Sequence, residues 1–170
     1  LAVTPNICPA ELRTFLNRIP GPDAEHATAF MRHWLQFIRD HFDVWKHTAR
    51  VGDPPGLGAA EVYAHIVRDH GFLCLVNQNP FPRATTFTLD GSIGLSASET
   101  FALTEVYPRQ CPVVEQPLPV ARRGDRIACV LSPHSVRIIE VGPASKARLP
   151  AVFGLPATIK LRLGDGGVGQ

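Results

Sequence analysis

The residues of this sequence that are best suited to chemistry are its carboxylates, histidines, serines and cysteines. Two carboxylates can work as general acid and general base when their surroundings separate their pKa values. The candidates are Asp40, Asp43, Asp53, Asp69, Asp90, Glu61, Glu99, Glu105 and Glu140. Each is expected on a helix surface, in a turn or at a strand edge, where nothing would raise one pKa above another. We therefore expect no catalytic residue in this chain.

His65, Asp69 and His70 form an HxxxDH string, which has the residue types of a metal site. The string is expected on a strand followed by a reverse turn at Asp69-His70-Gly71, where the side chains need not converge. Three histidines near the start of the chain are expected on a helix surface or in helix-to-sheet packing, namely His26, His33 and His41. No metal site is predicted.

Two further groups combine residue types that can act together. Asp43 and His47 are four residues apart and could share a metal, but this spacing favours a charged pair that supports a helix end. Ser132, His134 and Ser135 offer a nucleophile and a base. A catalytic triad also needs an acid and an oxyanion hole, and a turn between two strands supplies neither.

The four cysteines, Cys8, Cys74, Cys111 and Cys129, are widely separated and form no CxxC pair, so their spacing does not match a zinc site. Cys74 and Cys129 lie in apolar runs typical of strands. We expect both to be buried core residues, with a disulfide across the sheet as the alternative. No cofactor is predicted.

Composition indicates a globular protein of one ordinary domain, or of a small domain with part of another. The 170 residues are 45% hydrophobic and 19% charged, and the net charge of +2 does not predict a nucleic-acid partner. No apolar run approaches the roughly 20 residues that span a bilayer, so no membrane partner is expected. The chain opens on Leu1 without a signal-peptide pattern, which indicates a processed start or a fragment of a longer protein.

Two helices are expected to precede a sheet. Residues 9–19 carry apolar side chains at helical spacing, and the Pro-Gly-Pro run at 20–22 should end that helix. A longer helix is predicted from Ala24 to about His47, with Asp23 as its N-cap. Its apolar stripe is Ala27, Phe30, Met31, Trp34, Leu35, Ile38, Phe42 and Trp45.

After a Gly- and Pro-rich stretch, the apolar pattern changes to the period of two that is typical of strands. Strands are predicted at Val62–Val67, Phe72–Val76, Thr85–Leu89, Phe101–Tyr107, Arg126–Leu131, Ser135–Val141 and Thr158–Leu163. Phe72–Val76 is apolar on both faces and should be a central strand. Residues 108–119 are rich in proline and are a poor candidate for regular structure, whereas residues 132–134 should form a tight turn.

The order of these features resembles the C-terminal region of retaining α-glycosidases of the α-galactosidase-like kind. The matching pieces are the helix with Trp34, Phe37, Arg39, Asp40 and Trp45, Gly-Asp-Pro at 52–54, VYAHI, GFLCLVNQNPF, TFTLDGSIGL, FALTEVYP and LSPHSVRIIEV. In that family the last helix of a (β/α)8 barrel leads into an antiparallel β-sandwich. The resemblance covers about residues 23 to 142. The family's catalytic carboxylates lie on central barrel strands, which this chain does not contain.

The resemblance implies an α+β chain with four segments. These are a helical segment that ends a catalytic barrel, a linker, an antiparallel β-sandwich and an extension with one strand, at residues 1–51, 52–60, 61–142 and 143–170. The implied function is a non-catalytic portion of a glycoside hydrolase that braces the barrel. The alternative is a stand-alone β-sandwich module that binds carbohydrate or protein.

The expected partners follow from these two hypotheses. They are a catalytic barrel in the same or a longer chain, or a second copy that covers the aromatic helix, and carbohydrate. Sugar binding usually requires an exposed aromatic ring, and Phe81, in the turn at 77–82, is the one ring expected to be exposed.

Overall fold

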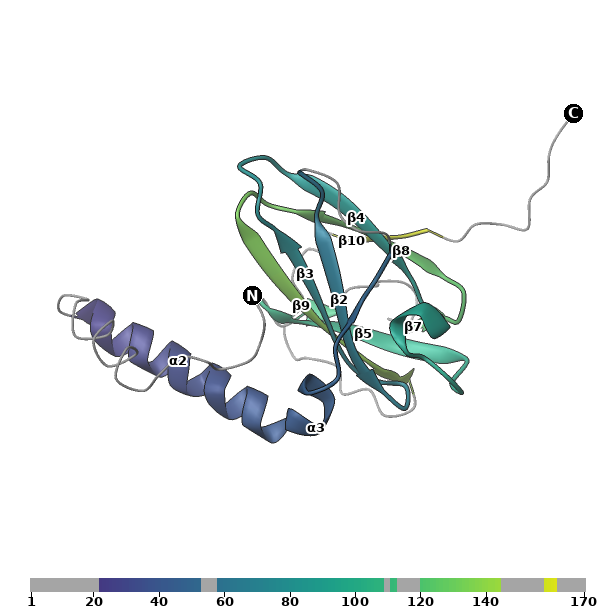
Figure 1. Ribbon diagram of the computed structural model, residues 1–170, viewed down its shortest axis with the longest axis horizontal. Coiled ribbons are helices and arrows are strands. Elements are labelled where there is room, and N and C mark those ends of the chain that lie inside the picture. The colour runs from purple at the N-terminus through teal and green to yellow at the C-terminus, as the bar shows by residue number, and fades with distance from the viewer. Residues whose placement is uncertain (1–21, 53–57, 109–110, 113–119, 145–157, 162–170) are drawn as a thin grey trace, which may run out of the picture. The chain divides into compact units, whose positions relative to one another are not determined.

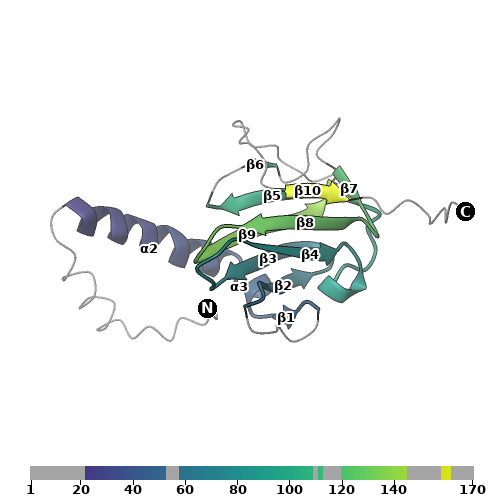
Figure 2. The ribbon, with the colours of Figure 1, turned by 90° about the horizontal axis from the view of Figure 1, so that it is seen from above.

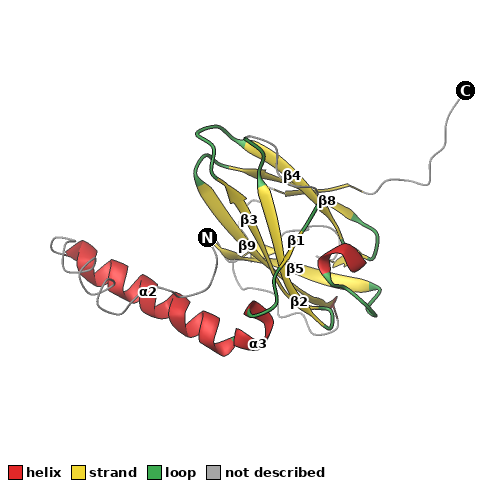
Figure 3. Cartoon of the chain, in the orientation of Figure 1, coloured by secondary structure: helices red, strands yellow, loops and turns green. Residues whose placement is uncertain are grey.

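The computed structural model describes residues 22–52, 58–108, 111–112, 120–144 and 158–161 (Figure 1). The chain divides into two compact units, Leu1–Trp45 and Lys46–Gln170. Helices occupy the first unit and antiparallel strands dominate the second (Figure 3), which confirms the predicted α+β class with a β-sandwich. The helix predicted for residues 9–19 lies outside the described residues.

The long helix is broken near its end, where the sequence predicts one continuous helix. Helix α2 runs from Pro22 to Asp40 and helix α3 from Phe42 to Trp45. The backbone N–H groups of Val44 and Trp45 both donate to the carbonyl of His41, so a new turn starts there. The helix also begins earlier than predicted, because proline fits a first helical position where its missing N–H costs nothing. Asp23 therefore lies in the first turn and is not the N-cap.

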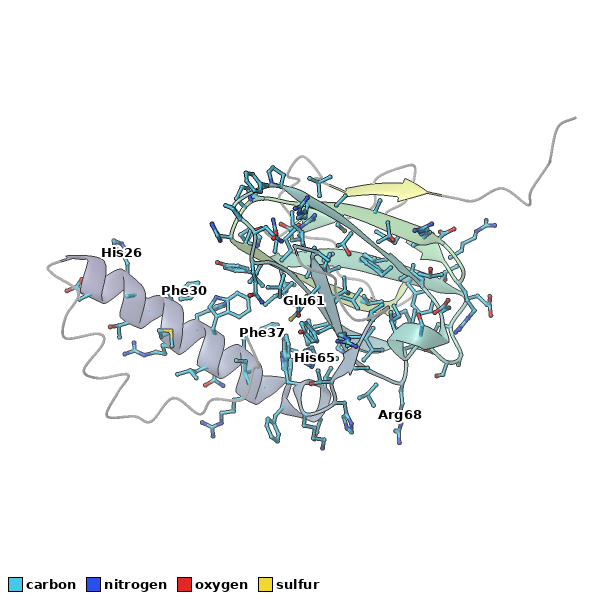
Figure 4. The ribbon with its side chains drawn as sticks, turned by 45° about the horizontal axis from the view of Figure 1, so that its top comes forward. His26, Phe30, Phe37, Glu61, His65 and Arg68 are labelled. Atoms are coloured by element: carbon cyan, nitrogen blue, oxygen red, sulfur yellow. The ribbon has the colours of Figure 1, made fainter. Side chains whose placement is uncertain are left out.

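Aromatic rings follow one side of α2 and α3. The ring centroids of Phe30 and Trp34 are 6.2 Å apart, those of Trp34 and Phe37 5.1 Å, and those of Phe37 and Trp45 6.2 Å. Figure 4 labels Phe30 and Phe37 on this helix. These distances and the tilted planes are typical of favourable aromatic pairs. Part of the apolar side stays exposed, since Phe42 is 58% exposed and Phe30 49%.

The second unit is a sandwich of two antiparallel sheets (Figure 2). The seven-stranded sheet has the order β1-β2-β3-β9-β5-β6, with β7 also paired to β5. Its strands are β1 (Ala49–Arg50), β2 (Glu61–Val67), β3 (His70–Asn77), β5 (Thr100–Tyr107), β6 (Cys111–Pro112), β7 (Val120–Arg122) and β9 (Ser135–Pro143). The three-stranded sheet has the order β10-β8-β4, with β4 (Arg83–Thr88), β8 (Arg126–Leu131) and β10 (Thr158–Leu161).

Strand β3 is central, as predicted, because β2 and β9 pair with it on either side. Alternate residues of the strands point into the space between the sheets and form the core. The fully buried core side chains are Leu73, Leu75, Leu89, Ile93, Phe101, Leu103, Ile127, Leu131, Ile139 and Val141. The sequence did not predict β1, β6, β7 or the short 3-10 helix η1 (Gly91–Ile93), and β6 lies within the Pro-rich stretch expected to be irregular.

The turn between β2 and β3 is shorter than predicted. Arg68 and Asp69 alone form it, with φ angles of +51° and +65°, which match the right-handed twist of a hairpin. His70 and Gly71 belong to β3, so the predicted reverse turn at residues 69–71 is wrong. A Cβ atom on Gly71 would collide with the carbonyl oxygen of His65, so the hairpin requires glycine there.

The connection from β8 to β9 is a crossing between sheets and not a hairpin. The strands end at Leu131 and begin at Ser135, as the sequence predicts, but β8 pairs with β4 and β10, whereas β9 pairs with β3 and β5. The β3–β4 connection makes the same kind of crossing. Both crossings are short, which allows one buried side chain to hold them together.

Candidate functional site

Asn77, at the end of β3, joins the two crossings into what we call the Asn77 corner, residues 77–83 and 131–135. Its Nδ2 group donates to the carbonyl oxygens of Phe81 and Ser132, both at 2.8 Å. Its Oδ1 atom accepts hydrogen bonds from the backbone N–H and the Nδ2 group of Asn79, both at 3.0 Å. The backbone N–H of His134 in turn donates to the carbonyl of Asn79 at 3.0 Å. Asn77 itself is buried, so the corner is firmly held from within.

Phe81 is displayed on this corner with 63% of its surface exposed. The ring contributes little to the core, although its carbonyl is fixed by Asn77. Its exposure agrees with the expectation from the sequence, and its role as a ligand-binding residue stays a prediction.

The three residues of the HxxxDH string have separate surroundings. His65 is buried, and its Nδ1 atom lies 2.9 Å from the carbonyl oxygen of His47 and 3.2 Å from Thr48 Oγ1. His70 Nε2 lies 3.1 Å from a carboxylate oxygen of Glu140 on the neighbouring strand β9. The structure thus gives these two histidines different partners on the seven-stranded sheet.

Asp69 binds a loop that follows η1. Its carboxylate accepts hydrogen bonds from the backbone N–H groups of Ser96, of Ala97 at 2.9 Å and of Ser98 at 2.7 Å. Burial alone raises the pKa of the carboxyl group, but these amide hydrogen bonds outweigh it and lower the pKa of Asp69 to about 2. The carboxylate therefore stays ionised and serves to fix the loop.

Arg123 holds the same loop from the other side. Its Nη2 and Nε atoms donate to the carbonyl oxygen of Ser98 at 2.9 and 3.1 Å. The guanidinium carbon lies 5.9 Å from the ring centroid of Phe101, and Nε is 3.7 Å from the exposed carboxylate of Glu99. Asp69 and Arg123 together give this loop a defined conformation.

Several other candidate carboxylates have local structural partners. Asp90 caps η1 by accepting from the N–H of Ser92 at 2.8 Å, and Asp40 accepts from Gln36 at 2.6 Å. Glu61 accepts a hydrogen bond from the hydroxyl of Tyr63 (Figure 4 labels Glu61). This hydrogen bond, followed by burial, raises the pKa of Tyr63. Asp53 lies outside the described residues.

Glu105 and Arg137 form a buried ion pair that the sequence analysis missed. Arg137 donates to Glu105 through Nε at 2.7 Å and through Nη2. Arg137 occupies the inward position of β9 that Ile139 and Val141 continue, and Glu105 the corresponding position on β5. A charge in phase with inward apolar residues on each of two strands is the signal that could have revealed this pair.

The remaining candidates do not converge on a catalytic arrangement among the described residues. Ser135 Oγ donates to the carbonyl of Ser132 at 2.6 Å, and His134 is exposed. Asp43 and His47 are both exposed. Across the part of the chain that the structure describes, no three metal-binding side chains gather, and no helix is long and apolar enough to cross a membrane.

Cys74 and Cys129 are buried thiols, as expected for core residues. Burial raises the pKa of the Cys74 thiol to about 12, so it is a poor nucleophile. Cys129 belongs to the core between the sheets, whereas Cys74 alternates with Leu73 and Leu75 and points to the opposite face of β3. Cys8 lies outside the described residues.

The face of the seven-stranded sheet that points away from the three-stranded sheet is apolar along β3, and Glu61, His65 and Glu140 are its polar neighbours on β2 and β9; we call it the outer face. On β3 it carries Phe72, Cys74 and Val76, all buried. Tyr63 on β2 and Ile138 on β9 lie directly opposite Cys74. The three-stranded sheet differs, because its own outward positions include Thr86, Thr88 and Arg126.

No known protein family model and no curated protein sequence matches the chain. Among solved structures, the fold resembles part of a candidate alpha-N-acetylgalactosaminidase from Bacillus halodurans, with 18% identity and a TM-score of 0.43. The similarity covers 56% of this chain and 20% of that protein, so it spans about a fifth of its length. It is a distant similarity in the fold of one region.

Proposed function

We propose that this chain is the non-catalytic C-terminal portion of a glycoside hydrolase, in which the β-sandwich braces a catalytic barrel. The observation that carries the proposal is the outer face of the seven-stranded sheet. A two-layer sandwich needs to bury only its inner faces, and the outward positions of its sheets are normally polar. Here Phe72, Cys74 and Val76 make a second apolar row on β3 that the chain itself already buries, so this sheet is suited to packing on both of its faces.

The aromatic side of α2 supports the same function. A helix that stands at the edge of a barrel packs against neighbouring helices as well as strands, and needs a wide apolar side. On α2 and α3 the ring series from Phe30 to Trp45 is flanked by a second series, Met31, Leu35, Ile38 and Phe42. Phe42 and Leu35 remain 58% and 39% exposed in this chain. Such residues fit a contact with barrel elements of a longer protein.

The surroundings of the described carboxylates favour a bracing role over catalysis. A retaining glycosidase needs two carboxyl groups roughly 5–5.5 Å apart on either side of the scissile bond. Asp69, Glu105 and Glu140 instead bind a loop, an arginine and a histidine. We therefore assign the chemistry to the barrel strands of the longer protein.

The outer face gives the proposal a direct test in the complete protein encoded by the gene. Replacing Ile138 with Glu places a charge on this face, and should lower the temperature at which hydrolytic activity is lost by more than it lowers the melting temperature of the 170-residue chain. The matched control is Val130→Glu, since Val130 is 54% exposed on the three-stranded sheet and should tolerate the charge. Equal inactivation temperatures for the two variants would exclude the outer face as the bracing surface.

The alternative function, a stand-alone β-sandwich module that binds carbohydrate or protein, predicts different solution behaviour for the 170-residue chain. It requires a monodisperse monomer in which Trp34 and Trp45 are both shielded from a collisional quencher. The bracing portion instead predicts a chain that associates through its helix, or a Trp34 that acrylamide quenches readily. Leu35→Glu and Phe42→Glu should restore a monomer if the helix causes the association.

A further inference from the structure

We infer that the Asn77 corner binds a neutral saccharide chain, with Phe81 as the ring on which a sugar stacks. This role goes beyond bracing a barrel. The side chain of Phe81 is 63% exposed, whereas its backbone carbonyl accepts a hydrogen bond from the buried Asn77 at 2.8 Å. The fold gains little from this ring, yet the backbone that carries it is fixed.

The rigidity of the corner favours ligand binding. Pro80 and Pro82 flank Phe81 and restrict the backbone on both sides. Asn79 donates twice to Asn77, and its carbonyl accepts from the N–H of His134 at 3.0 Å. A ring displayed on such a support loses little conformational freedom when a ligand covers it, so less of the binding free energy is spent on ordering.

The chemistry around the ring favours a sugar. A pyranose presents an apolar C–H face, which stacks on an aromatic ring, and a margin of hydroxyl groups that need hydrogen-bond partners. Around Phe81 the corner exposes polar side chains of both donor and acceptor character, namely Gln78, Arg83, Ser132 and His134. These residues include no carboxylate, so a cationic ligand fits them poorly, and the guanidinium of Arg83 can donate hydrogen bonds to sugar hydroxyls.

A protein partner fits this surface less well. A stable protein interface covers on the order of 800 Å² on each side and has an apolar centre. On the corner the exposed residues near Phe81 are mainly polar, and among the described residues of the sandwich unit Val130 is the other large apolar side chain that is exposed. One ring with a polar margin matches the size of a sugar unit.

The outward positions of the three-stranded sheet extend this surface along β4. Ala84, opposite Val130, follows the corner, and Thr86 and Thr88 continue the row. Arg126 Nη2 donates to Thr86 Oγ1 at 3.1 Å, which orients both polar groups on the surface. This row gives the further units of a saccharide chain hydroxyl and guanidinium partners.

Affinity electrophoresis of the 170-residue chain tests the inference. Native gels would contain galactomannan, soluble starch or hydroxyethylcellulose, and retardation relative to a plain gel measures binding. We expect at least one polysaccharide to retard the chain, and Phe81→Ala to weaken that retardation about tenfold. Phe81→Trp should preserve it. Phe42→Ala is the matched control, because Phe42 is an aromatic residue of similar exposure, 58%, outside the sandwich.

Two results would overturn the inference. One is the absence of retardation by all three polysaccharides; a loss of stability of the complete protein on Phe81→Ala would then assign the ring to a protein contact. The other is equal retardation of the wild type and Phe81→Ala. A thermal melt of Phe81→Ala that matches the wild type shows that the variant is folded. Hydrolysis assays are independent of these results, so the bracing function and sugar binding can fail separately.

Discussion

The carboxylate of Asp69 accepts a hydrogen bond from the backbone N–H of Ser98 at 2.7 Å, across 29 positions of the sequence. Asp69 sits at the tip of the β2–β3 hairpin, and the N–H groups of Ser96 and Ala97 donate to the same carboxylate. One side chain thereby fixes the loop that leads into β5.

Replacing Asp69 with Asn should destabilise the fold by about 2 kcal/mol, because the amide removes a charged acceptor from three N–H donors. Asn tolerates the positive φ of this position, so the substitution should not strain the backbone. Urea denaturation measures the change. Asp90→Asn is the control, since Asp90 accepts one hydrogen bond at an exposed helix end and should change stability by less than about 0.5 kcal/mol. Equal losses in the two variants would contradict this role of Asp69.

Acid should remove the contribution of Asp69 in a defined range. Its pKa of about 2 in the folded protein lies below the ordinary value of 3.8, so the folded state favours the ionised form. The contribution, about 2 kcal/mol, is therefore complete above the ordinary pKa and is lost as the pH falls toward the folded pKa. Denaturation of the wild type and Asp69→Asn at decreasing pH should converge. A difference that is constant with pH would be inconsistent with the lowered pKa.

Replacing Gly71 with Ala should cost more than about 2 kcal/mol, because the added Cβ would collide with the backbone of His65 and Ile66. Thermal denaturation would show the loss as a lower midpoint. Gly91→Ala is the control, because a Cβ there meets no atom within 4 Å. If both variants melted alike, the close approach at Gly71 would not be limiting.

Replacing Asn77 with Ala should destabilise the sandwich by about 3 kcal/mol, since it removes the several hydrogen bonds of a buried amide and takes this donor from the carbonyl of Phe81. It should also loosen Phe81 and abolish any saccharide binding at the corner. Chemical denaturation and affinity electrophoresis measure the two effects. Gln78→Ala, which alters an exposed neighbour, should leave stability unchanged. An unaltered midpoint for Asn77→Ala would show that the two crossings do not depend on it.

Cys74 should resist thiol reagents in the folded chain, because burial raises the pKa of its thiol to about 12. Mass spectrometry after iodoacetamide treatment should find it unmodified in native buffer and alkylated in denaturant. Rapid native labelling of Cys74 would mean that the outer face of the sheet opens readily.

The strands could be predicted from the sequence because their signal is local. Alternation located Arg126–Leu131 with the observed bounds, and the double-faced apolar run at residues 72–76 identified the central strand. The break at His41 had no such signal, since neither glycine nor proline interrupts the helix there. The sequence also does not predict which strands pair with each other, because a short turn after Leu131 has the same residue pattern whether it joins neighbouring strands or crosses to another sheet.

Individual side-chain roles were less predictable than the strands. Phe81 was expected to be exposed because it lies in a turn between prolines, and it is. Asp69 was expected to be an ordinary turn residue, since its partners are distant in sequence. Glu105 and Arg137 were not paired, because an ion pair between strands depends on the pairing of β5 with β9, which alternation alone does not define.

The most direct measurement of the bracing function compares hydrolysis of nitrophenyl α-glycosides by the 170-residue chain and by the complete protein encoded by the gene. We predict that the complete protein contains a barrel with paired carboxylates and hydrolyses a substrate, whereas the 170-residue chain hydrolyses none. Cleavage by the 170-residue chain alone would contradict the proposed function.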